Sequence, residues 1–339
     1  MIDMPRPFPF VWRLMRRFTR LGYWIAMALV GGAASWAGPS EPAQVSQLKV
    51  TLLSTMLADQ AAVGEWGFSA LVEADGHRIL FDTGAHPDVV LKNAKALGVD
   101  LSSIPEVILS HNHSDHVGGL LTLRQAVVGK HPGALSRVHV GEGIFYPRSS
   151  ERPRVEDNPM IEIKPAYERT GGVFVVHRAP VELYPGVWLT GPVPRKYPEH
   201  NWSGNQVITT PAGDREDTVP EDMALVVNTA RGLVIVTGCG HAGIVNISEY
   251  AQAVVRPARL HAIIGGIHLF AASDETLAWT AGKLNAFGID NLIGAHCTGV
   301  ETVFVFRREL RLDRAHAVVG AVGASFTLGT GISPGYIAR

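Results

Sequence analysis

Short apolar runs alternate with amphipathic segments along most of the chain, and glycine-rich turns separate them. Short apolar runs rich in β-branched residues are typical of strands, whereas apolar residues spaced three and four apart are typical of helices. The runs predict strands at residues 48–53, 68–73, 78–81, 106–109, 137–140, 172–177, 187–190, 223–228, 233–237, 261–264 and 291–295. The spacing predicts helices at residues 86–97, 117–128, 244–255 and 274–287.

The order of these elements predicts an α/β fold. Strand, helix and strand follow one another over residues 78–109, which implies a right-handed parallel crossover. Asp75 and Gly76 predict a tight hairpin turn between the strands at 68–73 and 78–81. The middle of the chain, residues 132–220, is the least regular part because proline-rich and charged loops separate its strands.

The N-terminal segment has the pattern of an export signal, predicted to span residues 1–37. Four arginines within residues 13–20 precede an uncharged apolar run over residues 21–37, and Ser35 and Ala37 are the small residues that a signal peptidase requires. Arg16 and Arg17 also suggest a twin-arginine signal. An uncleaved anchor is the rival interpretation, because the run is at the short limit for a membrane span. Residues 38–47 have the composition of a linker.

Composition narrows the class of protein. A chain of 339 residues with 46% hydrophobic residues can bury a large core. The formal net charge of −1 argues against binding of nucleic acid or of an anionic membrane. Two cysteines are too few for a disulfide framework, so a metal ligand, a buried thiol and a single bridge all stay open for them. A small-molecule substrate is therefore the expected partner.

Metal-binding side chains follow the strand at 106–109. His111 and His113 are two residues apart, so in an extended segment they leave on the same side and can bind one ion together. Asp115 and His116 follow where the chain turns into the next helix, and they can face a second ion. Gly118 and Gly119 remove side-chain bulk where the backbone passes the site. A solvated histidine-rich turn is the alternative, and the spacing H-x-H-x-D-H after a strand argues against it.

Three further strands end in metal-binding side chains beside glycine. Cys239 and His241 follow the strand at 233–237, His268 follows the strand at 261–264, and His296 follows the strand at 291–295. Ligands in open α/β sheets bind at the carboxyl ends of strands, so these side chains are expected to meet. Cys239 is either a ligand or a buried structural thiol.

Two other positions have open interpretations. Asp82, which closes the strand at 78–81, either forms a turn or orients metal-binding histidines. Arg195 lies in a loop with His200 and Trp202 that is either solvated or a lid, and as a lid its guanidinium would bind an anionic group of the substrate. Other histidines lie in turns, linkers or strand interiors and are expected to be surface or packing residues: His77, His131, His139, His261 and His316.

The histidine motif resembles the signature of the metallo-β-lactamase superfamily, which implies a four-layer αβ/βα sandwich over residues 48–330. Within the superfamily the chain is similar to 7,8-dihydropterin-6-methyl-4-(β-D-ribofuranosyl)aminobenzene-5′-phosphate synthases. That similarity rests on Asp82-Thr83-Gly84, Gly191-Pro192-Val193-Pro194-Arg195, Gly238-Cys239-Gly240-His241-Ala242-Gly243, Gly265-Gly266-Ile267-His268-Leu269 and His296-Cys297-Thr298-Gly299. The chain departs from the branch at Asn112, where glycine is more usual, and in its export leader, because a pterin intermediate is made inside the cell.

The resemblance implies two sets of metal ligands. His111, His113 and His241 would surround one ion, and Asp115, His116 and His296 the other. Two ions, zinc by preference with iron or manganese also fitting the ligand types, would activate a shared water. Asp115 could also orient that water. Because the six ligands already fill both sets, His268 is expected to face the substrate, as a proton donor or a hydrogen-bond partner.

Three functions fit these expectations. The first is an exported metal-dependent hydrolase, periplasmic or secreted, acting on an ester, lactam or phosphate. The second is a pterin-phosphate synthase, a transferase or lyase on the same scaffold. The third is an exported metal-binding protein without catalysis. The leader favours the first, and the motifs beyond the histidines favour the second.

Overall fold

The computed structural model describes residues 41–150 and 155–338, so the predicted export signal lies outside the described residues. Two large sheets form its centre. The first has eight strands in the order β18-β17-β1-β2-β3-β4-β5-β7. Their bounds are β1 Leu48–Ser54, β2 Ser69–Ala74, β3 His77–Phe81, β4 Glu106–Leu109, β5 Arg137–Gly141, β7 Val173–His177, β17 Ser325–Thr327 and β18 Gly331–Ser333. Strands β3, β4, β5 and β7 are parallel to one another.

The second sheet has seven strands in the order β16-β15-β14-β13-β12-β9-β8. Their bounds are β8 Val181–Tyr184, β9 Val187–Leu189, β12 Leu225–Thr229, β13 Gly232–Thr237, β14 Leu260–Gly265, β15 Asn291–Gly294 and β16 Ala317–Val319. Strands β13 to β16 are parallel. Both sheets therefore present carboxyl ends of several parallel strands, the place where α/β proteins bind ligands.

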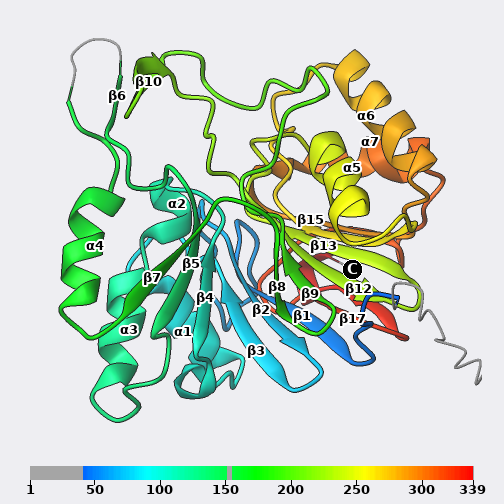
Figure 1. Ribbon diagram of the computed structural model, residues 1–339. Coiled ribbons are helices and arrows are strands. Elements are labelled where there is room, and N and C mark those ends of the chain that lie inside the picture. The colour runs from blue at the N-terminus through cyan, green and yellow to red at the C-terminus, as the bar shows by residue number, and fades with distance from the viewer. Residues whose placement is uncertain (1–40, 151–154, 339) are drawn as a thin grey trace, which may run out of the picture. The chain divides into compact units, whose positions relative to one another are not determined.

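Helices cover the outer face of each sheet (Figure 1). The eight-stranded sheet carries α1 Val89–Ala96, α3 Leu120–Val128 and α4 Met160–Glu168, and the seven-stranded sheet carries α5 Ile244–Val254, α6 Asp274–Ala286 and α7 Val300–Glu309. A small third sheet lies apart from these layers and consists of β6 Arg148–Ser150, β10 Gln206–Thr210 and β11 Gly213–Glu216. Within the described residues, none of the helices has the length and apolar character needed to span a membrane.

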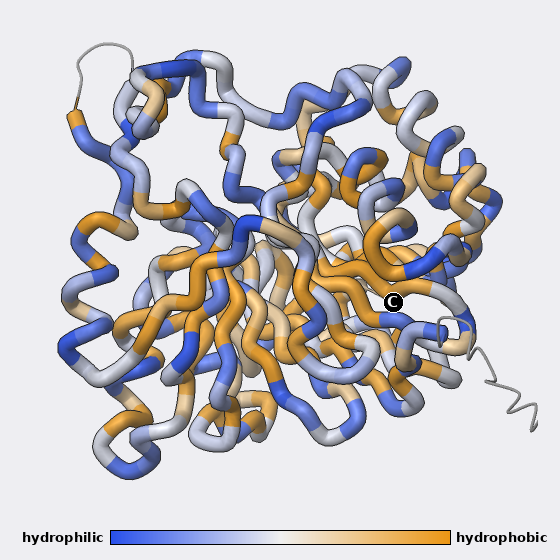
Figure 2. The backbone as a smooth tube through the Cα atoms, in the orientation of Figure 1, coloured by the Kyte–Doolittle hydropathy of each residue, from blue (hydrophilic) through white to orange (hydrophobic). Residues whose placement is uncertain are grey.

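Three apolar clusters match the three spaces between four layers. One fills the space between the sheets and includes Val50, Phe81 and Val236. A second joins the seven-stranded sheet to α5, α6 and α7, and a third joins the eight-stranded sheet to α1, α3 and α4. Figure 2 shows the same division, with apolar strands at the centre and polar positions along the loops. The predicted αβ/βα sandwich is confirmed.

Local boundaries differ from the predictions in several places. The helix expected at 86–97 begins only at Val89. The helix expected at 117–128 begins at Leu120 as α3, and a short helix, α2 Ser114–Val117, precedes it. Gly118 and Gly119 lie between the two, against the backbone of Ala85 and Thr83. A Cβ on Gly118 would lie 2.0 Å from the carbonyl oxygen of Ala85, which no side chain could tolerate. Glycine is thus required where the metal motif turns into the helix, as expected.

The ordered domain extends past both predicted ends. Val45, in the predicted linker, is buried and donates its N–H to the carbonyl of Asn228 at 2.8 Å. The N–H of Ser46 is bonded to the Asp75 carboxylate. At the other end β18 adds a strand to the eight-stranded sheet beyond residue 330. Residues 45–47 are therefore part of the fold and not a free linker.

Candidate metal centre

The four strand ends that carry the metal-binding side chains meet at one place. β4 leads to His111 and His113, β13 leads to His241, β14 leads to His268, and β15 leads to His296. The imidazole rings form a continuous group, with ring centroids 4.2 to 5.0 Å apart from His111 through His116 to His296. Segments more than 180 residues apart in the sequence thus contribute to one cluster.

The first predicted ligand set is assembled in the structure. One ligand atom each from His111, His113 and His241 lies within 4.8 Å of the others. The rings of His111 and His113 are 4.5 Å apart between centroids, and His241 lies 4.7 and 4.8 Å from them. His111 and His241 are fully buried.

The second predicted set is assembled beside the first. Asp115 places one carboxylate oxygen 3.2 Å from His296 Nε2 and the other 3.8 Å from His116 Nε2. One ligand atom from each of the three residues lies within 4.8 Å of the others. Both histidines are buried, whereas the Asp115 side chain is 19% exposed. The carboxylate therefore faces the opening of the site.

Several buried ring nitrogens at this place lack a partner among the described residues. His111 Nε2, His241 Nε2 and His296 Nδ1 have no hydrogen bond. A buried polar atom without a partner is costly, so such groups normally find one. Divalent metal ions accept imidazole nitrogen and carboxylate oxygen, so the residues fit a metal.

The electrostatic environment keeps most of these histidines neutral. Burial lowers the pKa of His111 and His241 well below the usual value, and neighbouring histidines lower each further. Burial also lowers the pKa of His113, to about 4. Neutral imidazole is the form that binds a metal, so these side chains are ready to bind one near neutral pH.

Asp115 and His116 form the charged part of the site. Burial opposes charge on both side chains, but each stabilises the charge of the other. Asp115 and Asp82 raise the pKa of His116 to about 9, while His116 and His296 lower the pKa of Asp115. Asp115 is therefore an anion that can bind a cation or accept a proton.

Asp82 is hydrogen-bonded to Ser110 and His116 of the metal motif. Its carboxylate accepts from His116 Nδ1 at 2.7 Å and from the N–H and hydroxyl of Ser110 at 2.7 and 2.8 Å. With Nδ1 bound, His116 turns Nε2 toward Asp115 and Cys239. Asp82 is fully buried and has a φ of +55°, an unusual conformation for a residue other than glycine. The predicted orienting role is supported by this geometry, and a simple turn-former would not need these contacts.

Cys239 and Cys297 lie together beside His268. Their Sγ atoms are 3.2 Å apart and both are free thiols, so no bridge joins them. Cys239 Sγ is also 3.1 Å from His116 Nε2, and Cys239, His268 and Cys297 form a further group that could hold a metal. Burial raises the pKa of the Cys239 thiol, whereas the contacts with Cys239 and with His296 lower the pKa of Cys297 despite its burial. Cys239 is positioned to contact a bound ion.

His268 borders both the metal-binding side chains and an adjoining cavity. Its ring lies 4.5 Å from His241 between centroids, and its Nδ1 has no hydrogen-bond partner among the described residues. Like His296, it has a positive φ, of +49°. The position agrees with the predicted substrate-facing role. The group formed with the two thiols leaves a ligand role open as well.

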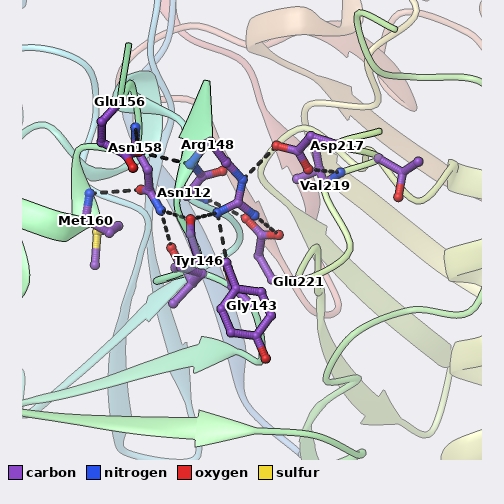
Figure 3. A network of polar contacts seen from close by, with 12 residues as sticks. Asn112, Gly143, Tyr146, Arg148, Glu156, Asn158, Met160, Asp217, Val219 and Glu221 are labelled. Atoms are coloured by element: carbon purple, nitrogen blue, oxygen red, sulfur yellow. Dashed lines mark hydrogen bonds and ion pairs between the residues drawn. The ribbon is translucent and has the colours of Figure 1, made fainter. Parts of the chain in front are cut away.

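A buried ion-pair network supports the loop between His111 and His113 (Figure 3). The Arg148 guanidinium binds Asp217 at 2.7 Å and Glu221 at 2.6 Å. Glu221 in turn accepts from the N–H of Asn112 at 3.3 Å. Arg148 also donates to two backbone carbonyls. Sequence inspection missed this network because its members lie in the irregular middle of the chain, and only the shared buried charge reveals it.

Arg195 is partly buried and contacts the backbone of three residues. Its Nη2 donates to the backbone carbonyls of Thr218, Val219 and His241, and burial lowers its pKa despite nearby carboxylates. The guanidinium is therefore bound to the main chain beside the metal motif. These contacts give it a role in positioning the His241 loop. Its guanidinium also lies 5.3 Å from the ring of Trp202, so its predicted contact with the substrate stays a prediction.

Two cavities adjoin the metal-binding residues. One, of about 640 Å³, is lined by His268, Trp202, Phe270 and Trp279 among others. The other, of about 510 Å³, is lined by His113, Asp115 and Arg148, with Trp66 at its side. Trp66 packs edge-on against both His296 and Phe270. The sequence analysis overlooked Trp66, although an exposed tryptophan beside glycines is a signal for a binding site.

This combination of a four-layer sandwich and an H-x-H-x-D-H cluster at the strand ends defines a known class. The chain belongs to the metallo-β-lactamase superfamily, whose family model matches residues 67–194. Its similarity extends much further than that match.

Two relatives cover most of the chain. The 7,8-dihydropterin-6-methyl-4-(beta-D-ribofuranosyl)-aminobenzene-5'-phosphate synthase of Methanocaldococcus jannaschii is 30% identical over 269 residues, which are 74% of this chain and 87% of the relative. The crystal structure of Tm1679, described as a metal-dependent hydrolase of the β-lactamase superfamily, is 31% identical and superimposes with a TM-score of 0.63. That match covers 78% of this chain and 93% of Tm1679.

A second solved structure shows the fold alone. YhfI from Bacillus subtilis, a metallo-β-lactamase fold protein, is 15% identical with a TM-score of 0.52, over 83% of this chain and 99% of YhfI. The predicted superfamily and the predicted similarity to the pterin-phosphate synthase are both confirmed by these comparisons.

Proposed function

We propose that the protein is a metal-dependent hydrolase with a two-ion centre, with zinc as the preferred ion. The observation that carries the proposal is the pair of adjoining ligand sets, in which buried ring nitrogens without partners converge on two small volumes. Divalent ions bound there lower the pKa of water and polarise an oxygen of the bond to be cleaved. The substrate class is an ester, a lactam or a phosphate ester.

The chain supplies the groups that handle protons. Asp115 is ionised, partly exposed and beside both ligand sets, so it can orient water and accept its proton. His268 lies at the wall of the larger cavity, where it can donate a proton to a leaving group. No serine or cysteine nucleophile is needed in this scheme.

A pterin-phosphate synthase activity is the second candidate, favoured by the similarity to the archaeal enzyme over 87% of its length. The product named there carries a 5′-phosphate. Among the residues lining the two cavities, Arg148 is the one Lys or Arg, and Asp217 and Glu221 already bind its guanidinium. A phosphate placed away from the ligand sets would therefore find no unpaired cation among the described residues that line the cavities, which supports the hydrolase.

Export to the periplasm or secretion is part of the proposal and rests on the sequence of residues 1–37 alone. If the signal is cleaved, the N-terminus of protein recovered from that compartment will lie near Gly38. Full-length protein in the membrane fraction would instead show an anchor. Recovery from the cytoplasm would favour the synthase.

A substrate panel tests the activity. Metal-loaded protein is assayed with an aryl ester, a lactone, a β-lactam and an aryl phosphodiester, alongside the chelator-treated protein and His113→Ala. The proposal expects metal-dependent turnover of at least one of them, abolished by both controls. Tight metal binding without turnover would indicate a non-catalytic metal-binding protein, and turnover only in a pterin-phosphate synthase assay would establish the second candidate.

A further inference from the structure

The larger cavity has aromatic walls. Phe270 and Trp279 line it and keep 52% and 37% of their surface exposed, which is unusual for such large apolar side chains. Trp202 lines the cavity as well, stacked on His200 with ring centroids 3.9 Å apart. Exposed aromatic side chains can pack against an aromatic ring of a ligand, either stacked or edge to face.

This cavity opens onto the metal-binding residues through His268. That ring lies 5.4 Å from Phe270 and 4.5 Å from His241, between centroids. A molecule whose reacting bond lies at the ligand sets can therefore extend past His268 into the cavity. The group that enters it is attached directly to the bond that is cleaved.

The charged side chains that line the cavity favour an uncharged occupant over an anionic one. The lining residues include Glu199 and Glu275 and neither a lysine nor an arginine. The Glu199 carboxylate is already bound by the N–H groups of Val245 and Asn246, and burial raises its pKa to about 7. A negative ligand group would meet no cation among the lining residues and would face Glu275. Two cations lie against the aromatic walls instead, with the Arg195 guanidinium 5.3 Å from the Trp202 ring and Lys283 Nζ 5.8 Å from the Trp279 ring.

The second cavity does not compete for such a group. Carboxylates from Asp115, Asp157 and Asp217 line it, with the paired guanidinium of Arg148. A flat apolar group placed there would remove these charges from water without replacing their contacts, which is costly. The two cavities therefore suit different parts of a substrate, apolar on the His268 side and polar on the Asp115 side.

We propose that the cavity formed by Trp202, Phe270 and Trp279 binds an uncharged, planar aromatic group of the substrate, attached next to the bond that is cleaved. The assignment rests on the proposed hydrolase function, which it deepens by naming the substrate class. Its test measures binding separately from turnover, so that the two can fail independently.

Equilibrium binding to the metal-loaded protein is measured by calorimetry for three probes: naphthylmethanol, the saturated decahydronaphthylmethanol and the anionic hydroxymethylnaphthoate. Naphthylmethanol is expected to bind most tightly, because it is flat and uncharged. Phe270→Leu and Trp279→Leu should each weaken its binding roughly three- to tenfold, the range for loss of one aromatic contact. Phe304→Leu is the matched control, because Phe304 is 49% exposed on α7 and does not line the cavity.

Equal binding of the saturated probe or of the anion would overturn the assignment. So would an equal effect of the Phe270 and Phe304 variants. Selective naphthylmethanol binding without hydrolysis of any ester would support the aromatic cavity and refute the proposed reaction. Hydrolysis without naphthylmethanol binding would refute the cavity assignment and leave the reaction standing.

Discussion

Asp82→Asn is expected to weaken metal binding although Asp82 is not a ligand. The carboxylate accepts three hydrogen bonds, one of them from His116 Nδ1 at 2.7 Å. An amide has one acceptor oxygen, so at least one of the partners Ser110 and His116 would meet an NH₂ group instead. Oδ1 accepts from the Ser110 N–H, and Oδ2 accepts from the Ser110 hydroxyl and from His116. An NH₂ group in place of Oδ2 removes the contact that directs His116 Nε2 toward the second ligand set, and one in place of Oδ1 displaces the backbone beside His111.

The magnitude follows from what the carboxylate does. Carboxylates that orient a metal-binding histidine typically contribute about ten- to a hundredfold in metal affinity, equal to about 1.4–2.7 kcal/mol of binding free energy. Asp82 is fully buried, so no water replaces its contacts and the upper part of this range is expected. The Ser110 contacts hold the backbone next to His111, so the first ligand set should weaken to a smaller extent.

Competition with a chelating indicator measures both affinities in wild type and variant. Asp290→Asn is the matched control, because Asp290 binds His261 Nδ1 at 3.0 Å, the same type of contact. That pair lines a separate cavity remote from the metal ligands. Wild-type affinity in Asp82→Asn, or an equal loss in Asp290→Asn, would refute the reasoning.

Three further predictions concern single side chains. His268→Gln should leave the metal content unchanged while lowering turnover roughly a hundredfold or more; loss of one metal equivalent, measured by elemental analysis, would make His268 a ligand. Arg148→Met leaves the carboxylate of Glu221 buried without its partner and should lower the free energy of unfolding by about 3–5 kcal/mol, measured in urea; an unchanged midpoint would contradict this. Burial opposes ionisation of Glu106, but His139 and Arg137 lower its pKa from 4.5 to about 2. The ionised carboxylate therefore stabilises the fold above pH 4.5, the pKa in the unfolded chain, and this stabilisation is lost as the pH falls toward 2. Glu106→Gln should therefore destabilise the protein at pH 7 by about 2 kcal/mol and much less near pH 2; an equal loss at both would disprove the linkage.

The site could be predicted from the sequence because each ligand follows shortly after a strand that the sequence itself indicates. An apolar strand such as β4 is visible from its residues alone, and parallel strands bring their carboxyl ends together, so His111, His241 and His296 could be expected to meet. The two ligand sets came from the family resemblance, and the structure assembles both of them. The third group, with Cys239 and Cys297, could not be foreseen, because the 3.2 Å contact depends on the register of β13 and β15.

The middle of the chain was harder because its contacts are tertiary. Helix α4 contains Pro165 and was not predicted, since proline within a short apolar segment argues against a helix. His139 was expected to be a packing residue, and it is buried. It also binds Glu106 and His177 through its two ring nitrogens, contacts that the sequence pattern does not show. The loop of Arg195 was expected to be either solvated or a lid, and its contacts with backbone carbonyls are ones that no sequence pattern shows.

Metal stoichiometry is the most direct test of the two-ion centre. Elemental analysis of protein prepared without chelator should find about two divalent ions per chain, and His113→Ala and His296→Ala should each lose about one. His316→Ala is the control, because His316 is half-exposed and bound to Asp313 outside the cluster. A wild-type protein without metal, or histidine variants that keep the full complement, would contradict the account.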